Sequence, residues 1–237
     1  MHIKNISLLF VIILFISCIS QQPISSELTE EQLWAIALTG IMTEINYDSH
    51  STLNSNKKRK KEVYLEVLRR DWGINNRNEL LETLIEVEKD GFAPYLDSMK
   101  VLIMENNGNM EQIFKESQYS EYGKRRLLFV LENWEIYKSI NIKSWDMGRN
   151  IALCRWGYDV GYLSEDEAWE KIMYFAKQIQ PIYKSWNEYG FSYYLGRIFW
   201  ASGFGPVEEY INKTEQIYKK LIGESGHWNK LKWDIQL

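Results

Sequence analysis

Apolar residues recur every three or four positions along most of the chain, which is the pattern of amphipathic helices. Helix starts are marked by Thr29 with Gln32, by Asn76, and by Ser164 with Glu167, because such pairs and caps satisfy the first backbone N–H groups of a helix. The pattern predicts helices over about 29–45, 57–70, 80–89, 94–105, 109–117, 120–139, 143–161, 165–180, 187–202 and 206–221.

No series of alternating segments that would build a sheet interrupts these helices, and no internal repeat is visible. We therefore expect an all-α fold, a single compact multi-helix domain over residues 28–237. The tail at 231–237 alternates like a short strand, and its other interpretation is an extended segment that docks on the helices.

The first residues follow a different pattern. Nine consecutive apolar residues at 8–16 have the length of a signal-peptide core and are too short to cross a bilayer as a helix. The run ends at Phe15 to Cys18, which resembles a bacterial lipobox. We predict a signal peptide over 1–17, lipidation of Cys18 and a polar tether over 18–27. An ordinary signal peptide cut nearby and an uncleaved anchor are the alternatives.

This prediction places the protein outside the cytoplasm, as an exported lipoprotein anchored to a membrane of the bacterial cell envelope. Two acyl attachments at one cysteine give stable anchoring. Lipidation of Cys18 would leave Cys154 without a partner for an intrachain disulfide. The basic run at 57–61 has two interpretations, contact with anionic headgroups or a solvated loop and helix start.

Charge and composition narrow the function classes. The 237 residues carry 28 Lys and Arg against 32 Asp and Glu, a net charge of −4, which argues against a nucleic-acid partner. After removal of a signal peptide only His50 and His227 remain, and neither lies in a recognisable catalytic or metal-binding motif. No glycine-rich phosphate-binding loop is present. We expect no metal site and no cofactor.

The helix predicted over 143–161 is apolar around most of its circumference. At 100° per residue Arg149 falls inside the apolar stripe, and Asp146 lies three residues earlier on the adjoining face. A buried arginine needs a partner because an uncompensated buried charge is strongly unfavourable. We therefore expect an Asp146–Arg149 pair. The polar side of this helix is predicted to hold Ser144, Gly148, Arg155 and Asp159.

The helix predicted over 187–202 places Arg197 on a face with Tyr193 and Trp200 and without an acid. Arg197 therefore needs a partner from elsewhere, such as Asp146 or a bound anion. One interpretation is a small polar ligand pocket walled by aromatic residues, and the other is a buried network that fixes helix packing. The candidate ligand-binding residues are Asp146, Arg149, Asn150, Tyr193 and Arg197.

The segment 134–200 holds 17 of the 34 aromatic residues, and closely spaced Trp, Gly and charged positions within it form a recognisable series. Over about 140–200 this series resembles a bacterial family, domain-of-unknown-function family 1266, and the segment 72–81 resembles it more loosely. The resemblance implies a mostly helical bacterial domain and no particular activity. The matching runs are Trp145-Asp146-Met147-Gly148-Arg149, Arg155-Trp156-Gly157-Tyr158, Gly161 to Trp169, Ser185 to Tyr189 and Ser192 to Trp200.

The function hypothesis from the sequence is a membrane-tethered helical domain that binds an unknown protein or small-molecule ligand. An envelope-associated hydrolase or transferase that uses a buried Asp/Arg pocket is one alternative, and an immunity-type antagonist protein is another. The sequence offers no nucleophile–base pair in a known arrangement, which favours binding over catalysis.

Overall fold

The computed structural model describes residues 28–56, 61–116 and 119–237, and every regular element in these ranges is a helix. The predicted signal peptide, Cys18 and the tether lie outside the described residues, as do positions 57–60 of the basic run. The elements are α1 (Glu30–Ala37), α2 (Gly40–Asn46), α3 (Lys61–Trp72), α4 (Arg77–Asp90), α5 (Phe92–Glu105), α6 (Met110–Glu116), α7 (Glu121–Glu132), α8 (Trp134–Tyr137), α9 (Lys143–Val160), α10 (Glu165–Ile179), η1 (Gln180–Ile182), α11 (Trp186–Ser202), α12 (Glu208–Ile222) and η2 (Trp228–Lys230).

The predicted all-α class is confirmed, and the three helix starts form as expected. Thr29 and Gln32 make a reciprocal capping box at α1, and Ser164 and Glu167 make another at α10. The Asn76 side chain accepts from the first backbone N–H groups of α4. Because each cap depends on residues adjacent in sequence, the pattern was sufficient to locate it.

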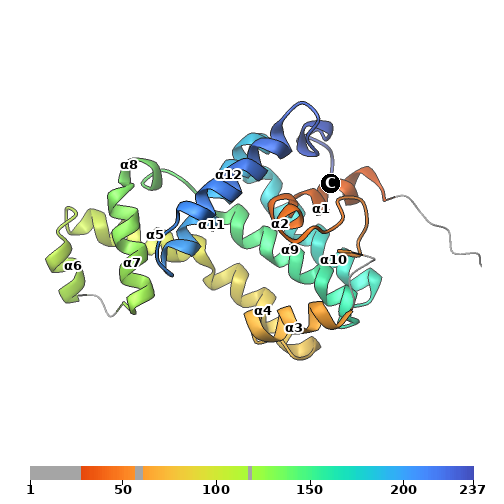
Figure 1. The fold of residues 1–237 in the computed structure, drawn as a ribbon, viewed down its shortest axis with the longest axis horizontal. Coiled ribbons are helices and arrows are strands. Elements are labelled where there is room, and N and C mark those ends of the chain that lie inside the picture. The colour runs from red at the N-terminus through yellow and green to blue at the C-terminus, as the bar shows by residue number, and fades with distance from the viewer. Residues whose placement is uncertain (1–27, 57–60, 117–118) are drawn as a thin grey trace, which may run out of the picture.

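Helix α9 runs through the centre of the domain and packs against α3, α4, α5, α10 and α11 (Figure 1). All its residues from Ser144 to Gly157 are buried. The expected polar side is therefore wrong for Ser144, Gly148 and Arg155, while Asp159 is half-buried. The physical reason is that neighbouring helices surround α9, so no side of it is left for solvent.

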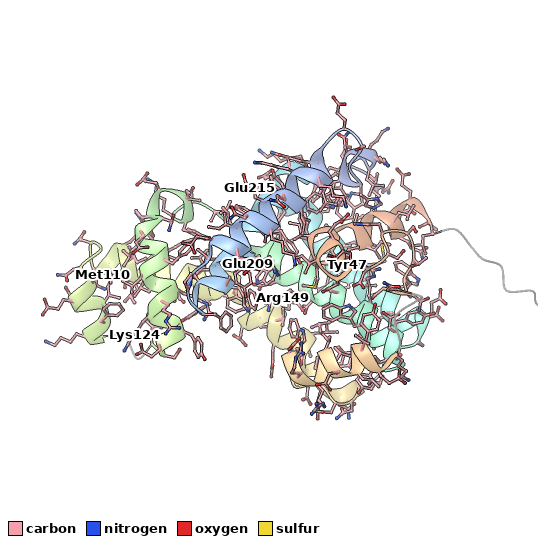
Figure 2. The ribbon with its side chains drawn as sticks, viewed as in Figure 1. Tyr47, Met110, Lys124, Arg149, Glu209 and Glu215 are labelled. Carbon is pink, nitrogen blue, oxygen red and sulfur yellow. The ribbon has the colours of Figure 1, made fainter. Side chains whose placement is uncertain are left out.

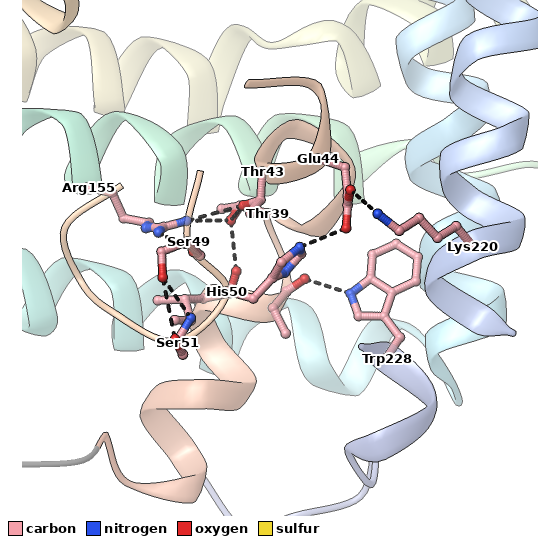
Figure 3. A network of polar contacts seen from close by, with 11 residues as sticks. Thr39, Thr43, Glu44, Ser49, His50, Ser51, Arg155, Lys220 and Trp228 are labelled. Atoms are coloured by element: carbon pink, nitrogen blue, oxygen red, sulfur yellow. Dashed lines mark hydrogen bonds and ion pairs between the residues drawn. The ribbon is translucent and has the colours of Figure 1, made fainter. Parts of the chain in front are cut away.

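Arg155 is only 2% exposed and is held by neutral oxygen atoms (Figure 3). Its guanidinium donates to the backbone oxygens of Leu53, Ser49, Thr52 and Asn54 and to the hydroxyls of two threonines on and beside α2. These bonds fix the loop 47–56 against α9. The backbone oxygens of this loop have no regular secondary structure to pair them, and Arg155 supplies hydrogen-bond donors to four of them.

The single helix predicted over 29–45 is divided into α1 and α2. Trp228 Nε1 donates to the Ala37 oxygen at 2.7 Å, and the Tyr189 hydroxyl donates to the Leu38 oxygen at 2.5 Å. Both donors come from the C-terminal half of the chain and capture carbonyls that a continuous helix would use internally. Tertiary contacts thus decide where α1 ends.

Two further segments differ from the prediction. The helix expected over 120–139 is divided at Asn133, whose side chain donates to the Phe129 oxygen at 2.8 Å. The tail at 231–237 forms no strand and docks on the helices instead. The Trp233 carbonyl accepts from Trp34 Nε1 at 3.1 Å and from Gln180 at 3.0 Å.

Two clusters of buried residues form the core. The larger cluster joins α1 to α4 with α9, α10 and the C-terminal segment. The smaller cluster joins α5, α7 and α8 with part of α11, at the left of Figure 1. Phe92, at the start of α5, packs against both clusters. The result is one compact domain in which α9 and α11 carry the predicted site residues.

Candidate functional site

A cleft of about 560 Å³ opens between α2, α3, α9 and α11. Its volume falls in the range of small-molecule sites, roughly 300–1,000 Å³. It reaches both Arg149 and Arg197, and four tryptophans form much of its wall. The lining residues are Met42, Ile45, Asn46, Val67, Arg70, Asp71, Trp72, Trp145, Arg149, Trp156, Arg197, Trp200 and Phe204.

Arg149 lies on the central helix α9 in the interior of the domain (Figure 2) and is 7% exposed. Its NH2 group donates to Asp146 Oδ1 at 2.6 Å, so the predicted pair forms. The guanidinium carbon lies 5.4, 5.0 and 5.1 Å from the ring centroids of Trp72, Phe92 and Trp145. Burial lowers the pKa of Arg149, and Asp146 opposes that shift. An aromatic cage thus surrounds a cation that one carboxylate neutralises.

Asp146 also binds the first turn of α5. Its carboxylate accepts from the backbone N–H of Phe92 at 3.0 Å and of Ala93 at 2.7 Å, which are the first amides of α5. Asp146 therefore caps α5 from a different helix, and the partial positive charge of that helix end adds to the attraction. Asp146 does not line the cleft. The structure gives it a role in fixing α5 against α9.

Arg197, on α11, has no carboxylate partner among the described residues, and the suggested pairing with Asp146 does not form. Its Nε donates to Thr214 Oγ1 at 3.1 Å, and its guanidinium carbon lies 5.8 Å from the Trp200 ring and 5.6 Å from the Tyr210 ring. Burial lowers its pKa. Arg197 is thus a half-buried cation whose NH1 and NH2 groups have no hydrogen-bond partner among the described residues.

Tyr193 lies behind the cleft and is fully buried. Its ring packs edge-on against Trp145, with centroids 5.2 Å apart, and its hydroxyl has no hydrogen-bond partner in the described structure. Burial raises the pKa of this hydroxyl, and the charges of Arg197 and Arg149 act on it in the opposite direction. Both cleft arginines are therefore close enough to affect the pKa of the buried Tyr193 hydroxyl.

Asn150 faces another way. Its amide donates to the Leu84 oxygen at 2.9 Å and ties α9 to α4. Of the five candidate residues, the structure places two in the cleft, Arg149 and Arg197, and one directly behind it, Tyr193. Asp146 and Asn150 hold neighbouring helices in place.

The sequence predicted aromatic walls for the pocket but did not identify Trp72, Trp156 and Phe204 as part of them. Trp72 comes from the end of α3, Trp156 from α9 and Phe204 from the segment after α11. Trp72 and Trp156 lie in segments that resemble the family, which was the available signal. At the rim Asp71 is ion-paired with Arg70 at 2.6 Å, and this bond lowers the pKa of Asp71.

Arg149 also borders a second cavity of about 430 Å³ beside α4 and α5. That cavity is lined by Glu86, Asp90 and Tyr95 among others, and Arg149 is its only basic lining residue. Two acids against one arginine that is already paired make this cavity unsuited to an anion. The cleft between α2, α3, α9 and α11 is the better candidate because it contains the unpaired Arg197.

His50 and His227 are brought together away from the cleft (Figure 3 labels His50). Their ring centroids are 4.5 Å apart, His50 Nε2 lies 3.0 Å from Glu44 Oε1, and Lys220 lies 2.6 Å from Glu44 Oε2. Across the described ranges, His, Cys, Asp and Glu side chains form no group of three or more suited to a metal ion. In the same ranges no helix is both long and apolar enough to cross a membrane.

These features define a helical domain with a buried central helix and an arginine-containing aromatic cleft. The chain belongs to the family described as "Protein of unknown function (DUF1266)", whose model matches residues 67–233. The predicted family is confirmed, and the match extends beyond the block at 140–200. The cleft residues from Val67 to Phe204 all fall within it, and those of α2 precede it.

Two similar proteins come from Escherichia coli strain K12. The chain is 30% identical over 195 residues to "Uncharacterized protein YbeU", covering 80% of each chain. It is 28% identical over 167 residues to "Uncharacterized protein YbeR", covering 66% of this chain and 65% of that protein. No solved structure matches the chain significantly.

Proposed function

We propose that the domain is a binding module that takes a small organic ligand in the cleft between α2, α3, α9 and α11. The observation that carries this proposal is the meeting of Arg149 and Arg197 in one aromatic-walled cavity of about 560 Å³. Ligand sites combine apolar walls with a few polar groups that fix orientation, and this cleft has that composition.

The lining of the cleft supports binding rather than catalysis. It contains no serine, cysteine, histidine or lysine that could act as a nucleophile or base, and its only acid is Asp71. Asp71 is held ionised by Arg70 and would make a poor general acid. Asp146, the acid of the enzyme hypothesis, does not line the cleft and already accepts three hydrogen bonds, two from the backbone of α5 and one from Arg149.

The proposal includes the cellular setting that the sequence predicts. The lipobox-like end of the leader at Cys18 supports a lipoprotein of the bacterial envelope, with residues 18–27 as the tether. In that setting the domain would hold its cleft close to a membrane surface, where it could bind a small molecule. Labelling with a radioactive fatty acid tests the anchor, since Cys18→Ser would abolish the label.

Thermal unfolding of the full chain in mild detergent, followed by tryptophan fluorescence, tests the proposed binding. The compounds screened would be organic acids, neutral sugars and cell-wall fragments. A ligand at 100 times its dissociation constant adds about 2.7 kcal/mol of stability, which gives a visible shift. Stabilisation that is lost in Arg197→Gln supports the cleft. If no compound shifts the transition and a protein partner is captured instead, the small-molecule proposal fails.

A further inference from the structure

Three buried hydrogen-bond donors around the cleft have no acceptor in the described structure. They are Trp145 Nε1, Arg149 Nε and the Tyr193 hydroxyl. The Trp145 ring contacts both other side chains, so the three donors belong to one cluster. Buried polar groups in folded proteins nearly always have a partner. All three atoms are buried, so a ligand in the cleft would not contact them directly, and any preference for an anion must come from the charged groups that line the cleft.

The charge in and directly behind the cleft points to a negatively charged ligand. Arg70, Arg149 and Arg197 line it, and the nearby acids are Asp71, paired with Arg70, and Asp146, paired with Arg149. Arg197 is left as a cation without a carboxylate among the described residues, and the net charge of this set is about one positive unit. One negative charge on a ligand would balance it.

The hydrogen bonding of Arg197 restricts the shape of that anion. Its Nε is used by Thr214, so the NH1 and NH2 groups remain as a parallel pair of donors. A planar carboxylate can accept from both at once, which is the bidentate geometry that arginine favours.

The walls specify the rest of the ligand. Four tryptophans, Trp72, Trp145, Trp156 and Trp200, line the cleft, and Met42, Ile45 and Val67 add apolar area. Aromatic rings stack in offset or edge-on arrangements on such surfaces. A ligand that fills this cleft is therefore flat and apolar over most of its length.

We infer that the cleft binds an aromatic monocarboxylate, whose carboxylate is held by Arg197 and whose ring lies among the tryptophans. This inference rests on the proposed function and adds the chemical class of the ligand.

Calorimetric titration of the full chain in mild detergent tests the inference with 2-naphthoate, its neutral analogue 2-naphthamide, 2-naphthyl phosphate and acetate. We expect 2-naphthoate to bind at one site. The amide should bind at least tenfold more weakly because it lacks the charge, and acetate should bind at least tenfold more weakly because it lacks the ring. Naphthyl phosphate should bind no better than naphthoate.

Variants locate the carboxylate. Arg197→Gln should weaken 2-naphthoate at least tenfold and make the acid and the amide bind alike. Arg197→Lys, which keeps the charge and loses the paired donors, should give an intermediate loss. Arg77→Gln, at an exposed site on α4 outside the cleft lining, is the matched control and should leave ligand binding unchanged, and all variants share the same detergent background. Unchanged unfolding midpoints show that each variant is folded.

The outcomes of these titrations distinguish a failure of the aromatic-carboxylate inference from a failure of the proposed binding function. Equal binding of the acid and the amide, with no effect of Arg197→Gln, overturns the anion assignment and leaves the cleft open to neutral ligands. Tenfold tighter binding of the phosphate overturns the carboxylate class. Failure of every naphthalene compound, together with failure of the thermal screen, overturns both the inference and the proposed function.

Discussion

Arg149 and Asp146 form a 2.6 Å ion pair that is buried on both sides, and the same carboxylate caps α5 through two backbone amides. The pair therefore joins the central helix to the smaller core cluster. Each charge depends on the other because neither side chain is exposed enough for water to replace its partner. Removing one member leaves an uncompensated charge between the two clusters.

Arg149→Ala should accordingly destabilise the domain by about 3–5 kcal/mol, the range for breaking a buried pair by removing one partner. Chemical denaturation measures this loss. Arg69→Ala is the control, since Arg69 is exposed and its pair with Glu66 on one helix face contributes about 0.5 kcal/mol at most. A loss below about 0.5 kcal/mol for Arg149→Ala would show that the pair contributes no more than a surface contact.

Arg155→Ala should destabilise by more than about 3 kcal/mol, because the guanidinium makes six hydrogen bonds and a hydrogen bond to a charged group contributes about 1.5–3 kcal/mol net. The loss should appear first in the loop 47–56. Limited proteolysis of the folded protein would detect it as new cleavage there. Uncut loop in the variant, with wild-type stability, would contradict the role of Arg155.

The contrast between Arg149 and Arg155 shows which parts of the fold could be predicted from the sequence. Local rules placed the helix caps, the bounds of α9, α10 and α11, and the Asp146–Arg149 pair, because each depends on residues a few positions apart. Arg155 was assigned to a polar side, since helical periodicity assumes a side that faces solvent. Its acceptors come from a loop about a hundred residues away, which no local pattern reveals.

The candidate site divides in the same way. The absence of an acid on the face of Arg197 was visible in the sequence, and among the described residues Arg197 bonds to Thr214 and to no carboxylate. An aromatic wall was predicted, but the contribution of Trp72 was not, because Trp72 reaches the site through the packing of α3 against α9. His50 and His227 likewise meet only through the fold.

The contact between His50 and His227 predicts a loss of stability at acidic pH. Burial, with the charges of His50 and Lys230, lowers the pKa of His227 to about 4, and burial also lowers the pKa of His50. The two histidines therefore take up protons near pH 6.5 in the unfolded chain, whereas in the folded protein they stay neutral to a lower pH. Titration of these histidines therefore leaves the free energy of unfolding unchanged above about pH 6.5 and decreases it as the pH drops toward 4. The charged groups acting on the pair are Glu44, Arg155, Lys220 and Lys230.

Urea denaturation of the wild type and His227→Gln between pH 7.5 and 4, settings chosen to bracket the unfolded pKa of about 6.5, isolates this effect from other titrations. The variant carries no titrating group at 227, so the stability of the wild type relative to it should decrease as the pH falls. A difference that stays constant across this range would contradict the assignment.

Gly190→Ala tests the contact that divides the first helix. A Cβ atom at Gly190 would overlap the rings of Trp228 and Tyr218, and Trp228 donates to the Ala37 carbonyl where α1 ends. Alanine favours a helix by about 1 kcal/mol over glycine. Overpacking against a rigid indole opposes this by about 1–3 kcal/mol, and here it acts on two rings, so we expect net destabilisation.

Combining Gly190→Ala with Trp228→Leu in a double-mutant cycle should recover part of the loss, because the smaller side chain makes room for the methyl group. Additive losses, or a stabilised Gly190→Ala variant in chemical denaturation, would show that α11 and η2 adjust freely and that this packing does not set the end of α1.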